Sequence, residues 1–168
     1  MKKIRNMVRA SLFASLCAVC AWIAIPIPPI AVTLQTFALL LALGTLGGRW
    51  GTVTIGLYLL LGLVGLPVFS GFRGGAAALM GPTGGFLWGF LAAALVYWLL
   101  QRLGKLTAMA AAMVVCYLCG CGWFSHYAGT SLGSSFTVCV VPYLIPDAIK
   151  LWLAWSVSRR LGKHISCA

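Results

Sequence analysis

The chain alternates long apolar runs with short connections that are polar, charged or rich in glycine and proline. A helix needs about 20 apolar residues to cross the hydrocarbon core of a bilayer. The apolar runs predict six membrane-spanning helices at approximately residues 8–25, 35–47, 50–66, 85–100, 106–126 and 138–158. Because the connections leave no room for a soluble domain, we expect residues 1–168 to form one domain, an all-α integral membrane protein built as a bundle of six transmembrane helices.

The composition points to the same class of protein. Hydrophobic residues make up 62% of the chain and charged residues 8%, and the mean hydropathy is +1.03. Soluble domains carry about 25% charged residues, so this composition excludes a soluble protein. The first apolar run is expected to end at Pro26-Ile27-Pro28-Pro29, because proline lacks the N–H that a helix interior requires.

The positions of the basic residues indicate how the helices are oriented. The net charge is +11, and ten of the twelve basic residues precede the first apolar run, lie in alternate connections or follow the last run. The positive-inside rule places such residues in the cytoplasm, so we expect a multi-pass protein of the cytoplasmic membrane with both termini cytoplasmic. Contact with anionic lipid headgroups explains these charges better than nucleic-acid binding does. The ten residues are Lys2, Lys3, Arg5, Arg9, Arg49, Arg102, Lys105, Arg159, Arg160 and Lys163.

Three charged residues are not explained by topology, and all three belong to the outer half of the predicted bundle. Asp147 is the only acidic side chain in the chain, and Lys150 follows it in the same apolar run. Residues three apart share a helix face, and charges at membrane depth are costly. Arg73 lies in a long glycine-rich connection on the outer side, where glycine lets backbone approach a ligand closely.

Three roles for Asp147 follow from this pattern. It can form a structural ion pair with Lys150, or it can belong with Arg73 to an outward-open pocket whose excess positive charge suits a small monoanion. Lone intramembrane carboxylates also serve as proton relays in transporters. Uncharged polar residues near the outer ends of the runs are candidates for the same pocket, namely Thr33, Gln35, Thr36, Thr83 and Tyr143.

Motifs for catalysis and metal binding are absent from the sequence. No G-x-x-x-x-G-K-[ST] phosphate loop occurs, so the chain lacks the usual means of hydrolysing ATP. No G-x-S-x-G elbow surrounds a serine, and no enzymatic activity is expected. The cysteine groups at 17–20 and 116–121 lie in apolar runs, where cysteine packs as a small hydrophobe, so we expect neither a metal site nor a cofactor.

The first apolar run carries small residues at a spacing of four. Ala10, Ala14 and Ala18 share one face of the predicted helix, and small-xxx-small spacing lets a second helix approach closely. That second helix can belong to the same bundle or to a partner protein. The spacing alone leaves both possibilities open.

Four motifs together resemble the BioY family, the biotin-binding S-components of energy-coupling-factor (ECF) transporters. They occur in the family's order and extend over nearly the whole chain. The motifs are Val32-Thr33-Leu34-Gln35-Thr36-Phe37, Gly65-Leu66-Pro67-Val68-Phe69 followed by Gly74-Gly75, Gly81-Pro82-Thr83-Gly84-Gly85-Phe86, and Ile145-Pro146-Asp147-Ala148-Ile149-Lys150.

The resemblance implies a six-helix bundle that captures biotin from the outside. Members of the family typically work with a transmembrane coupling subunit and a pair of cytoplasmic ATPases. The Ala-x-x-x-Ala face of their first helix docks on the coupling subunit, and Ala10 and Ala14 match it, with Ala18 one turn further on.

The resemblance also assigns ligand-binding roles. Asp147 and Lys150 occupy the positions of an Asp and a Lys that the family associates with the ligand. Biotin has a carboxylate at one end, which suits Lys150 and Arg73, and ureido N–H donors at the other, which suit Asp147. Phe69, Phe86 and Tyr143 are expected to pack against its apolar part. The sequence leaves open which end of biotin meets which charged residue.

Two alternatives stay open beside biotin. Another small vitamin such as thiamine is the first, although its positive charge is a poor match for two pocket cations. The second is a non-transporting structural membrane protein, in which the pair of Asp147 and Lys150 only holds helices together. Phe72-Arg73 departs from the small residues that are common in the family at this point, so the predicted role of Arg73 rests on its charge.

Overall fold

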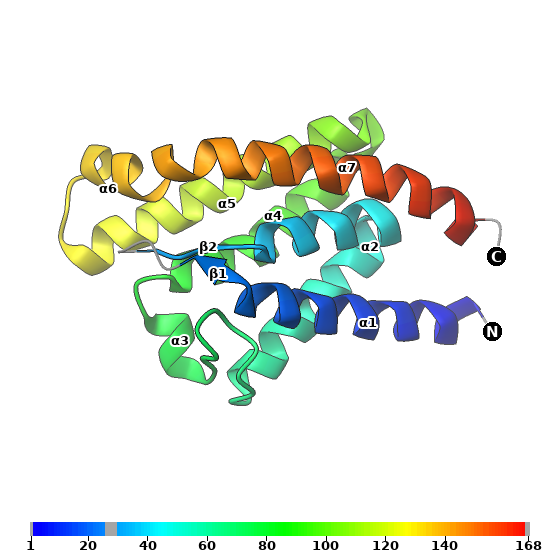
Figure 1. The fold of residues 1–168 in the computed structure, drawn as a ribbon, viewed down its shortest axis with the longest axis horizontal. Helices are drawn as coiled ribbons and strands as arrows, with labels where there is room; N and C mark the ends of the chain where they lie inside the picture. Colours follow the sequence, from blue (N-terminus) through cyan, green and yellow to red (C-terminus); the bar gives the residue numbers. More distant parts are fainter. Residues whose placement is uncertain (1, 26–29, 167–168) are drawn as a thin grey trace.

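The structure, a computed structural model, describes residues 2–25 and 30–166, and the side chains of residues 3–25 and 30–162. Five of the described helices are long and apolar enough to cross a membrane. The chain is almost entirely helical (Figure 1). Its elements are α1 (Lys2–Trp22), β1 (Ala24–Ile25), β2 (Val32–Thr33), α2 (Gln35–Leu63), α3 (Ala76–Met80), α4 (Gly84–Leu100), η1 (Gln101–Leu103), α5 (Lys105–Ala128), α6 (Leu132–Cys139), η2 (Val141–Tyr143) and α7 (Leu144–Ser166).

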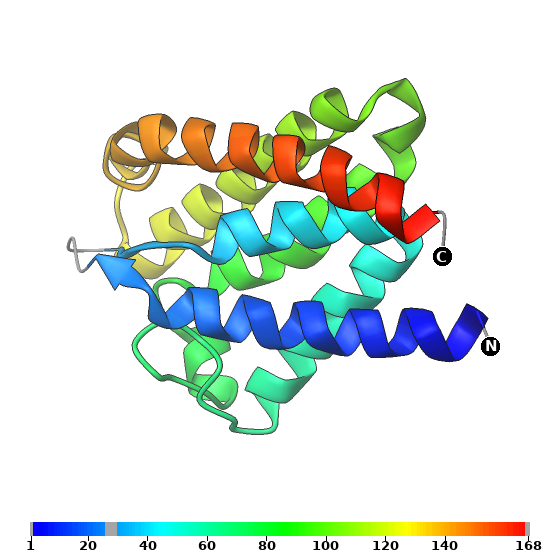
Figure 2. The same ribbon diagram turned by 45° about the vertical axis from the view of Figure 1, so that its right-hand side comes forward.

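The helix α2 contains two of the six predicted spans. Its backbone leaves the helical conformation at Gly47, where φ is 77° and ψ is 171°. Glycine tolerates this conformation because it has no Cβ, and the N–H of Gly48 is satisfied by Oε1 of Gln101 at 2.9 Å. The chain therefore reverses direction within α2 (Figure 2). The predicted ranges 35–47 and 50–66 correspond to its two halves, and the prediction of a six-span helical bundle is confirmed.

The first predicted span is too long by three residues. It was expected to reach Ile25, but α1 ends at Trp22, and Ala24 and Ile25 pair in antiparallel register with Thr33 and Val32. Pairing between the two short strands gives the backbone beyond the end of α1 hydrogen-bond partners that a helix would otherwise supply. The proline-rich segment 26–29, at which the helix was predicted to end, lies outside the described residues.

The prediction for residues 128–158 is wrong in detail. The polar segment before residue 138 was expected to be a connection, but it forms α6, whose N-cap Ser131 accepts a hydrogen bond from the N–H of Ser134. The last span was expected to begin near Val138, and α7 begins at Leu144, after η2. Serine is favoured at a helix N-cap, and proline is tolerated in the first turn, so Pro142 fits the start of η2.

The bundle has two distinct ends. The start of α1 and the end of α7 lie at one of them, with the kink of α2 and the turn between α4 and α5 (Figures 1 and 2); we call this the terminal end. The opposite end carries β1, β2, α3, α6 and the connection 64–75, and we call it the loop end (Figures 1 and 2). The first half of α2 lies in the core against α1, α7 and α4, so its N-terminus is held at the loop end.

Candidate ligand-binding site

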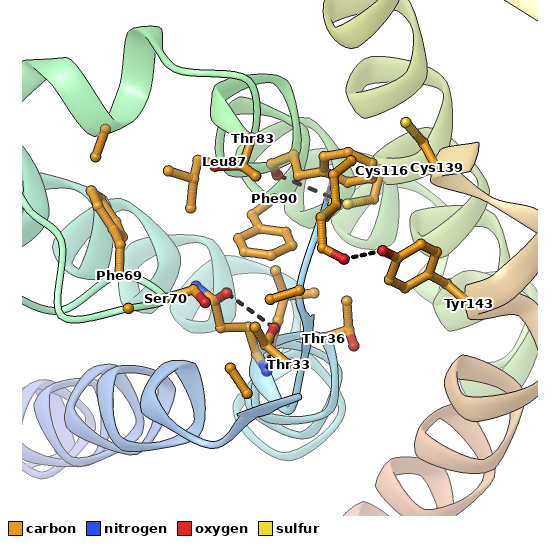
Figure 3. Close-up of a pocket in the computed structure, with 18 of the residues that line it drawn as sticks. Thr33, Thr36, Phe69, Ser70, Thr83, Leu87, Phe90, Cys116, Cys139 and Tyr143 are labelled. Atoms are coloured by element: carbon orange, nitrogen blue, oxygen red, sulfur yellow. Dashed lines mark hydrogen bonds between the residues drawn. The ribbon is translucent and has the colours of Figure 1, made fainter. Parts of the chain in front are cut away.

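A cavity of about 940 Å³ lies at the loop end, between the first turns of α2 and α7 and the segments that precede α4. Its size is within the range of about 300–1,000 Å³ that is typical of small-molecule sites. Figure 3 shows side chains from these elements pointing into the same space. All eight residues predicted to bind a ligand line this cavity: Thr33, Gln35, Phe69, Arg73, Thr83, Tyr143, Asp147 and Lys150.

Asp147 and Lys150 form an ion pair at the start of α7. The Nζ of Lys150 lies 2.7 Å from Oδ1 of Asp147, and the residues are only 7% and 3% exposed respectively. The ammonium also donates to the carbonyl oxygen of Thr33 at 2.7 Å. This second bond ties the start of α7 to β2, and it gives the buried ammonium two partners rather than one.

The carboxylate of Asp147 is held by two further donors. Thr36 donates to Oδ1 at 3.1 Å, and the hydroxyl of Tyr117 donates to Oδ2 at 2.6 Å. A buried carboxylate that accepts hydrogen bonds from several donors is fixed in orientation. Thr36 was a sequence candidate, but Tyr117 was missed: its one signal is a phenol in the apolar run 106–126, and the run's periodicity does not show that it faces α7.

A second polar group fixes the first turn of α2 to the connection that follows it. Gln35 donates from Nε2 to the hydroxyl of Tyr58 at 2.5 Å, and accepts from Thr33 Oγ1 at 3.1 Å. Tyr58 in turn donates to the carbonyl oxygen of Val68 at 3.0 Å. The ring of Phe69 packs edge-on against that of Tyr58, with centroids 5.5 Å apart. Two elements of the cavity wall are thereby held together from inside the bundle.

Arg73 lies at the mouth of the cavity and is exposed. Its carbonyl oxygen accepts from the N–H of Phe69 at 2.9 Å, which closes a tight loop. Phe72, within that loop, has φ of 56° and stacks on Trp22 with ring centroids 5.1 Å apart. Because Asp147 is the only acidic side chain in the sequence and is already paired with Lys150, the charge of Arg73 is not balanced by any side-chain carboxylate.

Most of the remaining wall is apolar. Tyr143 packs there with its hydroxyl donating to the carbonyl oxygen of Ile30 (Figure 3). Thr83 lies at the edge, directly before the first turn of α4. The cavity thus combines an apolar wall, one neutral ion pair and one unbalanced cation, which suits an amphipathic monoanion. Apolar and sulfur-containing residues that line it include Leu39, Leu40, Phe69, Phe86, Leu87, Phe90, Met113, Cys116 and Cys139.

The alanines predicted to form a docking face pack inside the bundle. Ala10, Ala14 and Ala18 are 2%, 1% and 7% exposed, and α1 packs along α2. The face of α1 that stays open carries Ser11 and Ser15, which are exposed and donate to the carbonyl oxygens one turn earlier at 3.1 Å. Of the two possibilities that the sequence left open, burial favours packing within the bundle for these alanines.

Comparisons with known proteins agree over nearly the full length. The model of the BioY family matches residues 1–166. The biotin transporter BioY of Thermotoga maritima is 38% identical over 165 residues, which cover 95% of this chain and 97% of that protein. A probable biotin transporter BioY of Pyrococcus horikoshii is 34% identical, with the same coverage of 95% and 97%.

A solved structure shows the same fold. The crystal structure of the S-component for biotin from an ECF-type ABC transporter superposes with a TM-score of 0.89 and 28% sequence identity. The match covers 96% of this chain and 93% of that one. The family model, the relatives and the solved structure agree: this multi-pass membrane protein belongs to the BioY family.

Proposed function

We propose that this chain captures biotin in the cavity at the loop end and serves biotin uptake as the S-component of an ECF transporter. Relatives that share its full length are biotin transporters. The observation that carries the proposal is the charge of the cavity: the neutral pair of Asp147 and Lys150 leaves one excess cation, Arg73. Biotin is a monoanion, so its carboxylate neutralises the site.

The two ends of biotin have different partners in this proposal. Arg73 lies at the mouth without a carboxylate partner, and it attracts the biotin carboxylate. Lys150, which lies 2.7 Å from Asp147, stays paired with that residue at the other end of the ligand. Asp147 lies deep and accepts a ureido N–H, because a carboxylate oxygen can accept more than one hydrogen bond. Phe69 and Tyr143 pack against the apolar chain and the thioether ring. Thr33, Gln35 and Thr83 complete the polar contacts.

The proposed orientation places the terminal end in the cytoplasm, in the cytoplasmic membrane. The basic residues at the chain ends, at the α2 kink and at the α4–α5 turn all belong to that end, and positive residues favour the cytoplasmic side. Anionic lipid headgroups would surround them. The cavity at the loop end then opens outward, so biotin is captured from outside the cell.

The sequence contains no phosphate loop for ATP, so the chain lacks the usual means of hydrolysing ATP itself. A transmembrane coupling subunit and two cytoplasmic ATPases supply the energy for uptake in this proposal. Since Ala10, Ala14 and Ala18 are buried, the coupling subunit would contact α1 on the neighbouring exposed face of Ser11 and Ser15. Small side chains there allow a partner helix to approach closely.

Equilibrium binding of labelled biotin to the purified chain tests the proposal. A lost charged hydrogen bond costs about 1.5–3 kcal/mol, or about 10- to 150-fold in affinity, and we expect a loss in this range for Asp147→Asn. We expect Arg73→Gln to weaken the binding of biotin but not of biotin methyl ester, which lacks the negative charge. Arg102→Gln removes the same charge at the terminal end and serves as the matched control.

Competition separates the proposal from its alternatives. Unlabelled biotin should displace the label at stoichiometric amounts, whereas thiamine in large excess should not. Displacement by thiamine in preference to biotin would assign the cavity to another vitamin. Absence of saturable binding in the folded chain would leave the ion pair of Asp147 and Lys150 with a structural role alone.

A further inference from the structure

A second hollow, of about 540 Å³, shares no lining residue with the cavity at the loop end. Three helices contribute to it: α2 just before its kink, the first residue of α5, and α7 near its end. Because these are the segments where the helices reach the terminal end (Figures 1 and 2), the hollow lies near the level of lipid headgroups. Its lining residues are Gly44, Thr45, Leu46, Gly47, Lys105, Arg159 and Gly162.

Two cationic residues, Lys105 and Arg159, line this hollow, and no acidic residue does. The only acidic side chain, Asp147, is paired with Lys150 in the other cavity. The guanidinium of Arg159 makes a cation–π contact with Trp155, and its central carbon lies 4.8 Å from the centroid of that ring. A Cβ on Gly162 would come within 3.4 Å of the Nζ of Lys105. The absence of a side chain at Gly162 thus leaves the ammonium free to reach into the hollow.

Thr45 adds an unpaired hydroxyl to the same place. Its side chain is buried, with 9% of the residue exposed, and its Oγ1 has no hydrogen-bond partner among the described residues. Other threonines of α2 behave differently: Thr52 donates to the carbonyl oxygen of Gly48 at 2.7 Å, and Thr54 to that of Trp50 at 2.9 Å. Buried polar groups in proteins are almost always paired, so this hydroxyl is available to donate to a ligand that enters the hollow.

We propose that the hollow binds a phosphate group, held by Lys105, Arg159 and the hydroxyl of Thr45. Two cations and one neutral donor match the oxygens and the negative charge of a phosphate. The phosphate can belong to the headgroup of an anionic phospholipid or to a free phosphate ion, and the recognition chemistry is the same. A bound phosphate relieves the repulsion between the two cations and satisfies the buried hydroxyl. This site is independent of the one that binds biotin.

The test uses the full chain in detergent after removal of native lipid. Native mass spectrometry measures the retention of phosphatidylglycerol, with phosphatidylcholine for comparison, and isothermal titration measures inorganic phosphate against chloride at equal ionic strength. Each cation near the membrane surface contributes about fivefold to the attraction of an anion. We therefore expect the double substitution Lys105→Gln with Arg159→Gln to weaken binding about 25-fold.

Matched variants distinguish specific binding in the hollow from a general attraction of anions by the net positive charge. Arg102→Gln with Arg160→Gln removes the same charge at the same end, outside the hollow. We expect a clearly smaller loss from this pair, because its side chains are not among those proposed to bind the phosphate directly. Thr45→Val should weaken binding by about 2- to 12-fold through one lost hydrogen bond, without lowering the unfolding temperature of the ligand-free chain. A purely structural Thr45 would not affect binding.

Each outcome decides the proposal. Specific retention of phosphatidylglycerol alone assigns the site to a lipid, and binding of inorganic phosphate alone assigns it to a free ion. Both results support a phosphate site if the Lys105 and Arg159 substitutions abolish them and the control pair does not. Equal losses in the two double variants, or no preference of the unmodified chain for either ligand, would overturn it.

Discussion

Asp147 accepts hydrogen bonds from Lys150, Thr36 and Tyr117, which come from three different helices. A charge buried without partners is costly, and breaking a buried ion pair by removing one member costs more than replacing both. The Asp147 carboxylate therefore has two roles. It organises the start of α7 against α2 and α5, and it places a fixed acceptor in the cavity.

Single and double substitutions separate these two roles. We expect Lys150→Met to lower the stability of the ligand-free chain by about 3–5 kcal/mol, because it leaves the Asp147 carboxylate unpaired. The double substitution Asp147→Asn with Lys150→Met should recover most of that loss while failing to bind biotin. Thermal unfolding in detergent measures the first quantity and labelled-biotin binding the second. A double variant that binds biotin normally would show that the pair has no role in recognition.

The pair of Asp147 and Lys150 could be predicted from the sequence, whereas its neighbours could not. One acidic residue in an apolar run, three positions from a lysine, is conspicuous because a charge at membrane depth costs free energy. Tyr117 and Tyr58 give no such signal, because a phenol is common in membrane helices. Their roles depend on which helices meet, and they reach partners 30 and 23 residues away in sequence.

At the scale of elements, the kink in α2 lets one continuous helical segment cross the bundle twice. Gly47 holds the kink with φ of 77° and ψ of 171°, a region that is essentially restricted to glycine. Space does not limit this position, because a Cβ would find only Gln101 Oε1, at 3.8 Å. The constraint on Gly47 is therefore conformational.

A glycine-to-alanine pair within α2 tests this constraint. We expect Gly47→Ala to destabilise the chain by about 1–3 kcal/mol through backbone strain. Gly56→Ala is the control, because a Cβ there meets nothing within 4 Å, and alanine in a helix interior is favoured by about 0.5–1 kcal/mol. Unfolding temperatures of the two variants should move in opposite directions. A shift of the same sign and size would contradict the account of the kink.

The burial of one face of α1 predicts two different defects for two neighbouring residues. Ala14→Trp forces a large ring into a packed core, so we expect loss of folded protein and of biotin binding. Ser15→Trp lies on the exposed face and should preserve binding while abolishing biotin uptake in cells that express the coupling subunits. If Ala14→Trp instead keeps binding and loses uptake, the alanines form the docking face after all.

The elements that sequence analysis missed are short and depend on tertiary contacts. The strand Ala24–Ile25 exists because Val32–Thr33 lies beside it, and no local pattern of two residues predicts a strand. The helix Leu132–Cys139 is rich in serine and glycine, which is also typical of a loop. The long apolar spans were predictable, since their length follows from the thickness of the bilayer.

At the scale of the whole molecule, the two ends carry different chemistry. The loop end holds the cavity with the Asp147–Lys150 pair and Arg73, and the terminal end holds the other basic residues. Reporter fusions test the orientation proposed from this asymmetry. A C-terminal green fluorescent protein should fluoresce, and alkaline phosphatase fused after residue 75 should be active, because it functions only outside the cytoplasm. The reverse pattern would invert the proposed topology.

The central claim is that biotin occupies the cavity at the loop end, and photoaffinity labelling tests it most directly. The probe is a biotin analogue with a small diazirine on its carboxylate chain, and mass spectrometry maps the modified peptides of the purified chain. We predict labelling within residues 31–40, 69–90, 112–117 and 139–150, which line the cavity, and we expect excess biotin to abolish it. Labelling confined to other segments, or labelling that excess biotin does not reduce, would contradict the account.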